Sequence, residues 1–268
     1  MQTFDTATAV LARPGETYAW HVPEGWLVGR GAWGGLIVGA LINAITDSEP
    51  DRRRWVRSVS AELVAPAMVG EHTIVTVRHR QGSGLSTWNA TATNADGELV
   101  ARLTAVLAAS RRSAEDVDYA AWGMTKAPAA PPAADVAAAD TKDFGPEFTQ
   151  HLDVRPVSGM AYSGGAAEVL GYVRLAAPVP HTAASLIGLV DGWWPATIVS
   201  LNRFRPLATV NFSANLMVDP TSIEADEPLL HHGFASGADA GFTSEQRRLW
   251  TGDGRLVVDN LQSIALIK

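Results

Sequence analysis

The sequence predicts an α+β protein with two similar halves, each combining one apolar helix with an antiparallel sheet. The order helix, long strand, further strands, hairpin and long strand occurs twice along the 268 residues. Short pieces also recur at matching places: residues 60–63 read SAEL and residues 213–216 read SANL, while residues 97–100 read GELV and residues 254–257 read GRLV. A repeat of about 150 residues is too long for a solenoid unit, so duplication of a whole small domain explains it better.

The first half contains one clear helix, in which apolar residues from Trp33 to Ile45 follow the i, i+3, i+4, i+7 spacing. Gly34 and Gly35 stand at its start, and the DSEP run at residues 47–50 ends it. Alternating or β-branched stretches then predict four strands and the NADG run predicts a hairpin turn. The expected strands cover residues 58–64, 73–78, 87–93 and 99–107, and the turn covers residues 94–97.

The second half repeats this order. A helix is expected over residues 182–194, and a strand over residues 208–218 alternates strictly, with Phe212 on the apolar face and Thr209 on the polar face. A hairpin turn at residues 252–254 matches the earlier one, and a last strand follows over residues 256–267.

A stretch between the halves differs in composition. Residues 110–147 are rich in Ala, Pro and Asp and show no periodicity, so they are interpreted as a linker. The expected organisation is an N-terminal domain over residues 1–110, a linker over 111–147 and a C-terminal domain over 148–268.

Composition excludes several functional classes. A net charge of −7 argues against nucleic-acid binding, which needs a basic surface. The chain has no cysteine, so a disulfide framework and a thiolate metal site are both excluded. Neither a signal peptide nor an apolar run of membrane-spanning length is recognised, and the expected location is the cytoplasm with no membrane partner.

Residues 29–34 match the G-x-G-x-x-G pattern and open the first helix, which is one feature of a dinucleotide site. The preceding strand is short and the later strands suggest hairpins, so a flexible entry into the helix is the preferred interpretation. The free backbone N–H groups of Gly34 and Gly35 could still polarise a carbonyl or bind an anion. No metal motif is present, and the adjacent His231 and His232 would point to opposite faces of a strand, so no metal or other cofactor is expected.

Asp191 is the most informative polar residue, because it lies in an apolar helical stretch just before Pro195. A buried carboxylate is costly unless it is paired or used in chemistry, although a structural hydrogen bond at a helix end explains it equally well. The alternation of apolar and polar residues predicts that Thr209 is a solvent-facing strand residue. Gln262 interrupts the apolar face of the last strand and needs hydrogen-bond partners there.

The arginines fall into groups at residues 52–54, at Arg203 and Arg205, and at 247–248. Such groups could hold a phosphate-bearing ligand, although solvated surface charge explains each one more simply. Trp194, in a run of apolar and aromatic residues, would suit an acyl pocket or a plain core.

Residues 32–41, 59–63, 186–195, 208–213 and 256–268 together resemble the bacterial acyl-CoA thioesterase II family of double hotdog proteins. The resemblance implies two tandem hotdog repeats, each with a long helix wrapped by an antiparallel sheet. It implies that Asp191, Thr209 and Gln262 hold and activate a water. It further implies an acyl-CoA or acyl-carrier thioester as substrate, an acyl tunnel beside the helix, CoA phosphates on the surface, and a homo-oligomer. The candidate substrate contacts from the residues themselves are Gly34, Gly35, Trp194, Arg203 and Arg205, and fatty acid metabolism is the expected setting.

Two other functions are compatible with the same fold. A non-catalytic protein that binds acyl-CoA or lipid would use the apolar interior alone, but it would not need Asp191, Thr209 and Gln262 together. A hotdog hydratase or dehydratase would need a catalytic histidine paired with an acidic residue, and none is recognised near Asp191 in the sequence.

Overall fold

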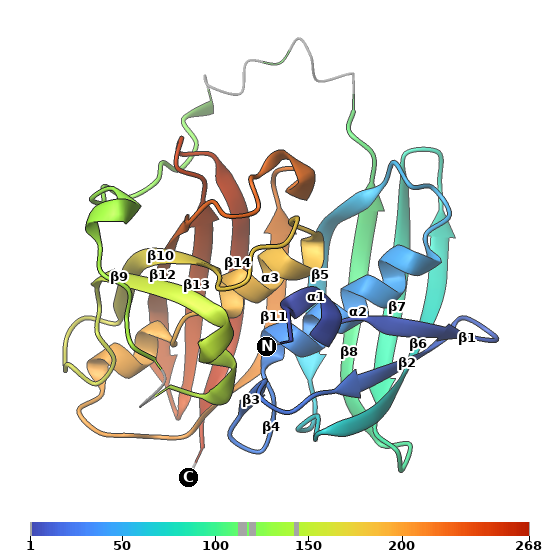
Figure 1. The fold of residues 1–268 in the computed structure, drawn as a ribbon, viewed down its shortest axis with the longest axis horizontal. Helices are drawn as coiled ribbons and strands as arrows, with labels where there is room; N and C mark the ends of the chain where they lie inside the picture. The colour runs from blue at the N-terminus through green and yellow to red at the C-terminus, as the bar shows by residue number, and fades with distance from the viewer. Residues whose placement is uncertain (1, 112–116, 118–121, 142–144, 268) are drawn as a thin grey trace.

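A single antiparallel sheet of twelve strands runs through both halves of the chain (Figure 1). The computed structural model describes residues 2–111, 117, 122–141 and 145–267. Its first half comprises α1 (Phe4–Ala7), β1 (Val10–Arg13), β2 (Thr17–Val22), β3 (Leu27–Val28), β4 (Gly31–Ala32), α2 (Gly34–Ser48), β5 (Trp55–Leu63), β6 (Gly70–Gln81), β7 (Leu85–Thr93) and β8 (Leu99–Ala108).

The second half begins with the 3₁₀ turns η3 (Ala133–Asp135) and η4 (Glu147–His151). It continues with β9 (Leu152–Ser158), β10 (Glu168–Leu175), α3 (Ala183–Asp191), η5 (Ala196–Ser200), β11 (Leu207–Leu216), η6 (Pro220–Ser222), β12 (Leu229–Asp239), β13 (Phe242–Trp250) and β14 (Leu256–Leu266).

The strand order is symmetric about its middle: β1-β2-β6-β7-β8-β5 on one side and β11-β14-β13-β12-β10-β9 on the other. The halves meet where β5 pairs with β11, and Ser60 lies directly opposite Ser213 in that pair. These are the first residues of the repeated SAEL and SANL pieces. The predicted duplication is therefore visible as two copies of one strand order.

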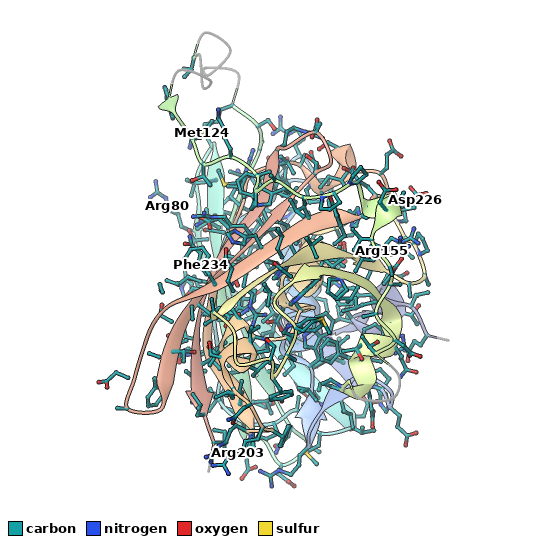
Figure 2. All side chains as sticks on the ribbon, turned by 90° about the vertical axis from the view of Figure 1, so that its left-hand side faces the viewer. Arg80, Met124, Arg155, Arg203, Asp226 and Phe234 are labelled. Atoms are coloured by element: carbon teal, nitrogen blue, oxygen red, sulfur yellow. The ribbon has the colours of Figure 1, made fainter. Side chains whose placement is uncertain are left out.

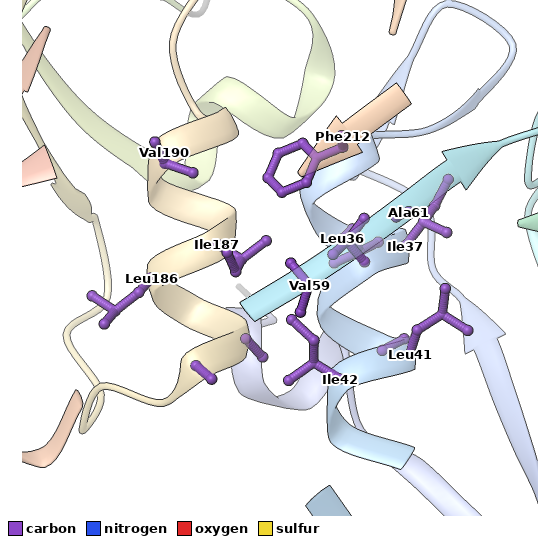
Figure 3. Close-up of a cluster of buried hydrophobic side chains, with 14 of the residues drawn as sticks. Leu36, Ile37, Leu41, Ile42, Val59, Ala61, Leu186, Ile187, Val190 and Phe212 are labelled. Atoms are coloured by element: carbon purple, nitrogen blue, oxygen red, sulfur yellow. The ribbon is translucent and has the colours of Figure 1, made fainter. Parts of the chain in front are cut away.

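The core lies between this sheet and the two helices α2 and α3, which pack side by side (Figure 1). Figure 3 shows Phe212 of β11 and Val59 of β5 facing the apolar side chains of both helices. Gly188 permits the close approach of α1 to α3, because a Cβ there would lie 2.8 Å from the ring of Phe4.

Helix α2 confirms the first predicted helix, whereas α3 is shorter than the 182–194 expected from the sequence. Its start is set by a capping box, in which Thr182 and Ser185 each accept a hydrogen bond from the other's backbone N–H. Its end falls at Asp191, because Gly192 follows and Pro195 cannot continue the backbone hydrogen bonding. The expectation of one long helix in each half therefore holds for the first half alone.

The G-x-G-x-x-G stretch is not a nucleotide-binding turn. Strands β3 and β4 pair antiparallel as a small hairpin, with Gly29 at a positive φ of 64° in the turn. A dinucleotide site needs a buried parallel strand at this place, so this alternative is excluded.

Part of the segment expected to be a linker packs on the second half. Ala130 and Val136 contact a small apolar cluster around Tyr172 and Trp250, and the Tyr172 hydroxyl donates to the Pro131 carbonyl at 2.6 Å. Residues 112–116, 118–121 and 142–144 of that expected linker lie outside the described residues. Among the helices in the described part of the chain, none is long and apolar enough to cross a membrane.

Candidate active site

A cluster of buried polar side chains lies in the second half, where α3 ends over the inner face of the sheet. Polar groups buried this deeply require partners, and this cluster supplies them internally. Its members come from α3, η5, β12, β13 and β14: Asp191, Thr197, His231, Thr243, Glu245, Arg247, Asn260 and Gln262.

Asp191 is the centre of this cluster, and its side chain is 8% exposed. Its Oδ1 accepts hydrogen bonds from Gln262 Nε2 at 2.8 Å and from Arg247 Nη1 at 3.2 Å. Burial raises the pKa of Asp191, while the Arg247 charge, Gln262 and the Gly35 backbone N–H act in the opposite direction. The carboxyl is therefore a better proton acceptor than an exposed aspartate.

The other carboxylate oxygen faces the start of α2 in the first half. A Cβ built on Gly34 would lie 3.1 Å from Asp191 Oδ2, and Trp33 Nε1 donates to the Asp191 carbonyl at 3.1 Å. The N–H groups of Leu36 and Ile37 both bond to the Trp33 carbonyl, so the helix ladder begins after the glycines. The cluster is thus completed by a helix N-terminus from the other half, a place that favours negative charge.

Thr209 and Gln262, singled out from the sequence, are joined to Asp191 in one chain of hydrogen bonds. Thr209 Oγ1 donates to Gln262 Oε1 at 3.0 Å, and Gln262 in turn donates to Asp191 and to Asn260 Oδ1. Gln262 is fully buried and Thr209 is half-buried. The amide of Gln262 is therefore held in one orientation by its neighbours.

The predicted outward orientation of Thr209 is wrong. The pairing of β11 with β14 shifts register between Thr209 and Asn211, which inserts one extra residue into β11. A bulge of this kind moves the preceding side chains to the other face of the sheet. Thr209 therefore shares the inner face with Phe212, against the strict alternation that the sequence suggested.

A buried ion pair on β13 was missed by the sequence analysis. Arg247 Nε contacts Glu245 Oε1 at 2.8 Å, and both side chains are almost completely buried. The sequence suggested either a phosphate contact or surface charge for residues 247–248, and neither describes Arg247. The available signal was alternation, because Glu245, Arg247 and the buried Leu249 share one face of a strand.

Trp194, Arg203 and Arg205 lie away from this hydrogen-bonded chain. Trp194 packs on the core and its Nε1 donates to the Gly159 carbonyl at 2.9 Å. Arg203 and Arg205 are exposed between η5 and β11, and Figure 2 shows Arg203 at the end of the molecule opposite Met124. Among the described contacts, none joins either arginine to Asp191.

His231 and His232 point to opposite faces, as predicted. His231 is buried with its ring stacked 5.0 Å from Trp193, whereas His232 Nε2 contacts Glu168 Oε1 at 2.7 Å on the outer face. Burial and the nearby Arg247 hold the pKa of His231 well below its usual value, so it is neutral. Within the described residues, no group of three or more His, Asp or Glu side chains could hold a metal ion.

The corresponding strand positions in the first half carry no ionisable side chain. Strand register relates Thr209, Glu245, Arg247 and Gln262 to four residues of that half, all of which are buried and none of which is ionisable. In the same order these counterparts are Val56, Trp88, Ala90 and Ala105. The polar cluster is therefore not a requirement of the fold.

Two family models match the chain. Residues 22–108 match the acyl-CoA thioesterase N-terminal domain, and residues 127–266, more than half of the chain, match the acyl-CoA thioesterase C-terminal domain. The chain belongs to the acyl-CoA thioesterase family. Membership of this family supports thioester hydrolysis as the general class of reaction.

Several solved structures share the fold of this chain. A hot dog fold protein of unknown function from Alicyclobacillus acidocaldarius is 27% identical, with 99% of this chain and 98% of that chain covered and a TM-score of 0.88. A putative thioesterase II from Thermobifida fusca is 24% identical, with 100% and 98% covered and a TM-score of 0.83. An acyl-CoA thioesterase II from Mycobacterium marinum is 17% identical, with 99% and 98% covered and a TM-score of 0.78. No curated protein matches the chain significantly.

Proposed function

We propose that this protein hydrolyses an acyl-CoA to the free acid and CoA by means of a water activated by Asp191. The observation that carries the proposal is the chain of hydrogen bonds from Thr209 through Gln262 to Asp191, set over the N-terminus of α2. A buried carboxylate with a raised pKa, held by a donor and aimed at a helix N-terminus, suits general-base chemistry.

In this mechanism Asp191 takes a proton from water as the water oxygen attacks the thioester carbonyl carbon. Thr209 and Gln262 orient the water and the carboxylate. The Gly35 backbone N–H donates to the Asp191 carboxylate, and the neighbouring Gly34 backbone N–H stabilises the negative charge that develops on the carbonyl oxygen. The tetrahedral intermediate then expels the CoA thiolate, which needs little help from an acid, and the proton on Asp191 returns to solvent or to the thiolate. Direct attack by Asp191 to form an anhydride is the alternative route.

The proposal extends to architecture and substrate contacts. Residues 1–110 and 148–268 are two hotdog repeats joined by residues 111–147, and the protein works as a homo-oligomer. Arg203 and Arg205 are exposed and positively charged, and exposed guanidinium groups suit the phosphates of CoA. Trp194 contributes apolar surface to the acyl group.

Thiol release from a panel of acyl-CoAs, short, long and aromatic, tests the function, with wild type measured beside Asp191→Asn. Turnover that disappears in the variant supports the proposal. A protein that binds acyl-CoA saturably, with no thiol release from any member of the panel or from acyl-carrier-protein thioesters, would instead be a binding protein.

The hydroxyl of Thr209 is expected to matter more than its shape. Thr209→Val keeps the volume but removes the donor to Gln262 Oε1, and we expect kcat to fall by about 10- to 100-fold, at the lower end of what one positioned group contributes. Thr209→Ser keeps the hydroxyl and is expected to retain most of kcat. Equal losses in the two variants would show that packing, and not the hydrogen bond, explains the effect.

Gly34 is expected to tolerate no side chain next to the carboxylate. Gly34→Ala places a Cβ 3.1 Å from both Asp191 Oδ2 and Leu63 Cδ1, closer than ordinary van der Waals contact. We expect a loss of at least about tenfold in kcat, since a displacement of 1 Å can cost about a hundredfold. Gly97→Ala, in a distant turn, is the control, because it changes stability through its positive φ but leaves the site unchanged. Full activity in Gly34→Ala would remove this helix start from the site.

A further inference from the structure

We propose that Arg247 and Glu245 are positioning residues for the reaction: Arg247 holds the Asp191 carboxylate and supplies its countercharge, while Glu245 holds Arg247 and offsets part of that charge. Neither residue is expected to touch the substrate. The catalytic consequence rests on the function proposed above, whereas the effect on Asp191 itself does not.

The geometry makes a continuous connection. Arg247 Nη1 contacts Asp191 Oδ1 at 3.2 Å, and Arg247 Nε contacts Glu245 Oε1 at 2.8 Å. Because the guanidinium is planar and rigid, fixing its Nε also fixes the direction of Nη1. The orientation of the Asp191 carboxylate is therefore determined from the sheet as well as by Gln262.

Glu245 is in turn tied to the segment that follows Asp191. Its Oε2 accepts from the Thr197 backbone N–H at 3.3 Å, and Thr197 Oγ1 donates to Thr243 Oγ1 at 3.1 Å. Thr197 lies in η5, just after the proline that follows α3. The ion pair thus anchors both the side chain of Asp191 and the backbone that leads away from it.

The charges in this cluster do not cancel, because two carboxylates share one guanidinium. The other described hydrogen-bond partners of Asp191 are uncharged: Gln262 from β14, and Trp33 and the Gly35 backbone N–H at the start of α2. The buried His231 from β12, which contacts the Val190 carbonyl, is neutral. Electrostatic interactions are strong at such buried positions. Asp191 should therefore respond to each member of the pair with opposite sign.

The first half shows that the fold does not need this pair. Its counterparts of Glu245 and Arg247 are Trp88 and Ala90, neither of which is ionisable, and the Trp88 indole donates to the buried Glu49 carboxylate at 2.9 Å. A buried ion pair is weak evidence for stability, since apolar replacements are often equally stable. A buried pair that is present in one half and touches the reactive carboxylate is better explained by what it does to that carboxylate.

The experiment titrates the Asp191 carboxyl carbon by NMR in protein labelled with ¹³C-aspartate, with the resonance assigned by its absence in Asp191→Asn. Arg247→Met removes the countercharge and should raise the titration midpoint by at least about one pH unit, a tenfold change in the ionised fraction. Glu245→Gln removes the competing carboxylate and should lower the midpoint. The acid limb of the kcat/KM profile should move in the same two directions.

Arg248→Met is the matched control, because Arg248 is the next residue on β13 but pairs with Asp259 on the outer face. It should leave the titration midpoint of Asp191 unchanged.

Arg247→Lys keeps the positive charge but loses the planar arrangement of several N–H donors. It should keep the midpoint near the wild-type value while lowering kcat. This variant replaces Arg247→Met in the experiment if Arg247→Met does not fold. Shifts of the same sign in Arg247→Met and Glu245→Gln, or no shift in either, would overturn the proposal. Opposite shifts in a protein without thioesterase activity would support the effect of Arg247 and Glu245 on Asp191 and would refute the proposed function.

Discussion

Replacing Asp191 by Asn is expected to lower kcat on the preferred acyl-CoA by at least about a thousandfold, within the range that a lost general base produces. An amide has almost the shape of a carboxyl and its oxygen can still accept from Gln262 and Arg247, so the cluster is expected to keep its arrangement. What the amide cannot do is take a proton from water. Undiminished turnover in this variant would refute the assigned role.

The same variant should gain stability relative to the wild type as the pH rises. Because burial raises the pKa of Asp191, the folded state binds this proton more tightly than the unfolded state does. The contribution of this group to stability is therefore lost as the pH rises through its folded pKa, and Asn does not titrate. Thermal unfolding followed from pH 4 to pH 8 should show a relative gain for Asp191→Asn that grows as the pH rises and levels off above the folded pKa of Asp191.

Asp259→Asn is the control for both measurements, because it exchanges the same groups on the outer face of the sheet, where Asp259 pairs with Arg248. It should retain full turnover and show no gain in stability at high pH. A marked loss of stability in Asp191→Asn would mean that the carboxylate serves the fold rather than the reaction.

Gln262→Leu is expected to have the next largest effect, with a loss in kcat of about 100-fold or more. Leucine has a similar size but can neither donate to Asp191 nor accept from Thr209, so both orienting hydrogen bonds disappear. The free energy of unfolding should also fall by about 1–3 kcal/mol, because the buried Asn260 Oδ1 loses its donor as well. Steady-state kinetics and denaturant unfolding measure the two effects.

The control for Gln262→Leu is Ser263→Ala, since Ser263 is the next residue on β14 and faces the opposite side of the sheet. It should change neither kcat nor the free energy of unfolding appreciably. If Gln262→Leu lost stability but kept wild-type kcat, Gln262 would be a structural residue and the proposed water-holding role would be wrong.

Several parts of the fold could be predicted because they depend on local pattern. The apolar periodicity from Trp33 to Ile45 predicted α2, since a helix buried on most of its surface needs such a run. The repeated SAEL and SANL pieces predicted the duplication, and they proved to face each other across the junction of the halves. The mismatch of Asp191 with its apolar surroundings drew attention to it for a physical reason that the structure bears out, namely burial.

Other features could not be predicted because they depend on pairing between distant segments. The inward orientation of Thr209 results from a bulge, and an extra residue in one strand is defined only relative to its partner β14. The burial of Glu245 and Arg247 contradicts the general tendency of charged residues to be exposed, and it becomes favourable only when each finds the other. The early end of α3, in contrast, follows from the local residues Gly192 and Pro195, to which the sequence analysis gave too little weight.

The sequence by itself determined the class of fold, the duplication, the family resemblance and the identities of Asp191, Thr209 and Gln262, since all of these are encoded in residue type and local spacing. Only the tertiary structure decided that these three side chains form one hydrogen-bonded chain, that the start of α2 from the other half completes the site, and that Arg247 shares its charge between two carboxylates. The reason is that hydrogen bonds and buried charges act over a few ångströms in space, and residues far apart in sequence reach that distance only when the two halves have packed together.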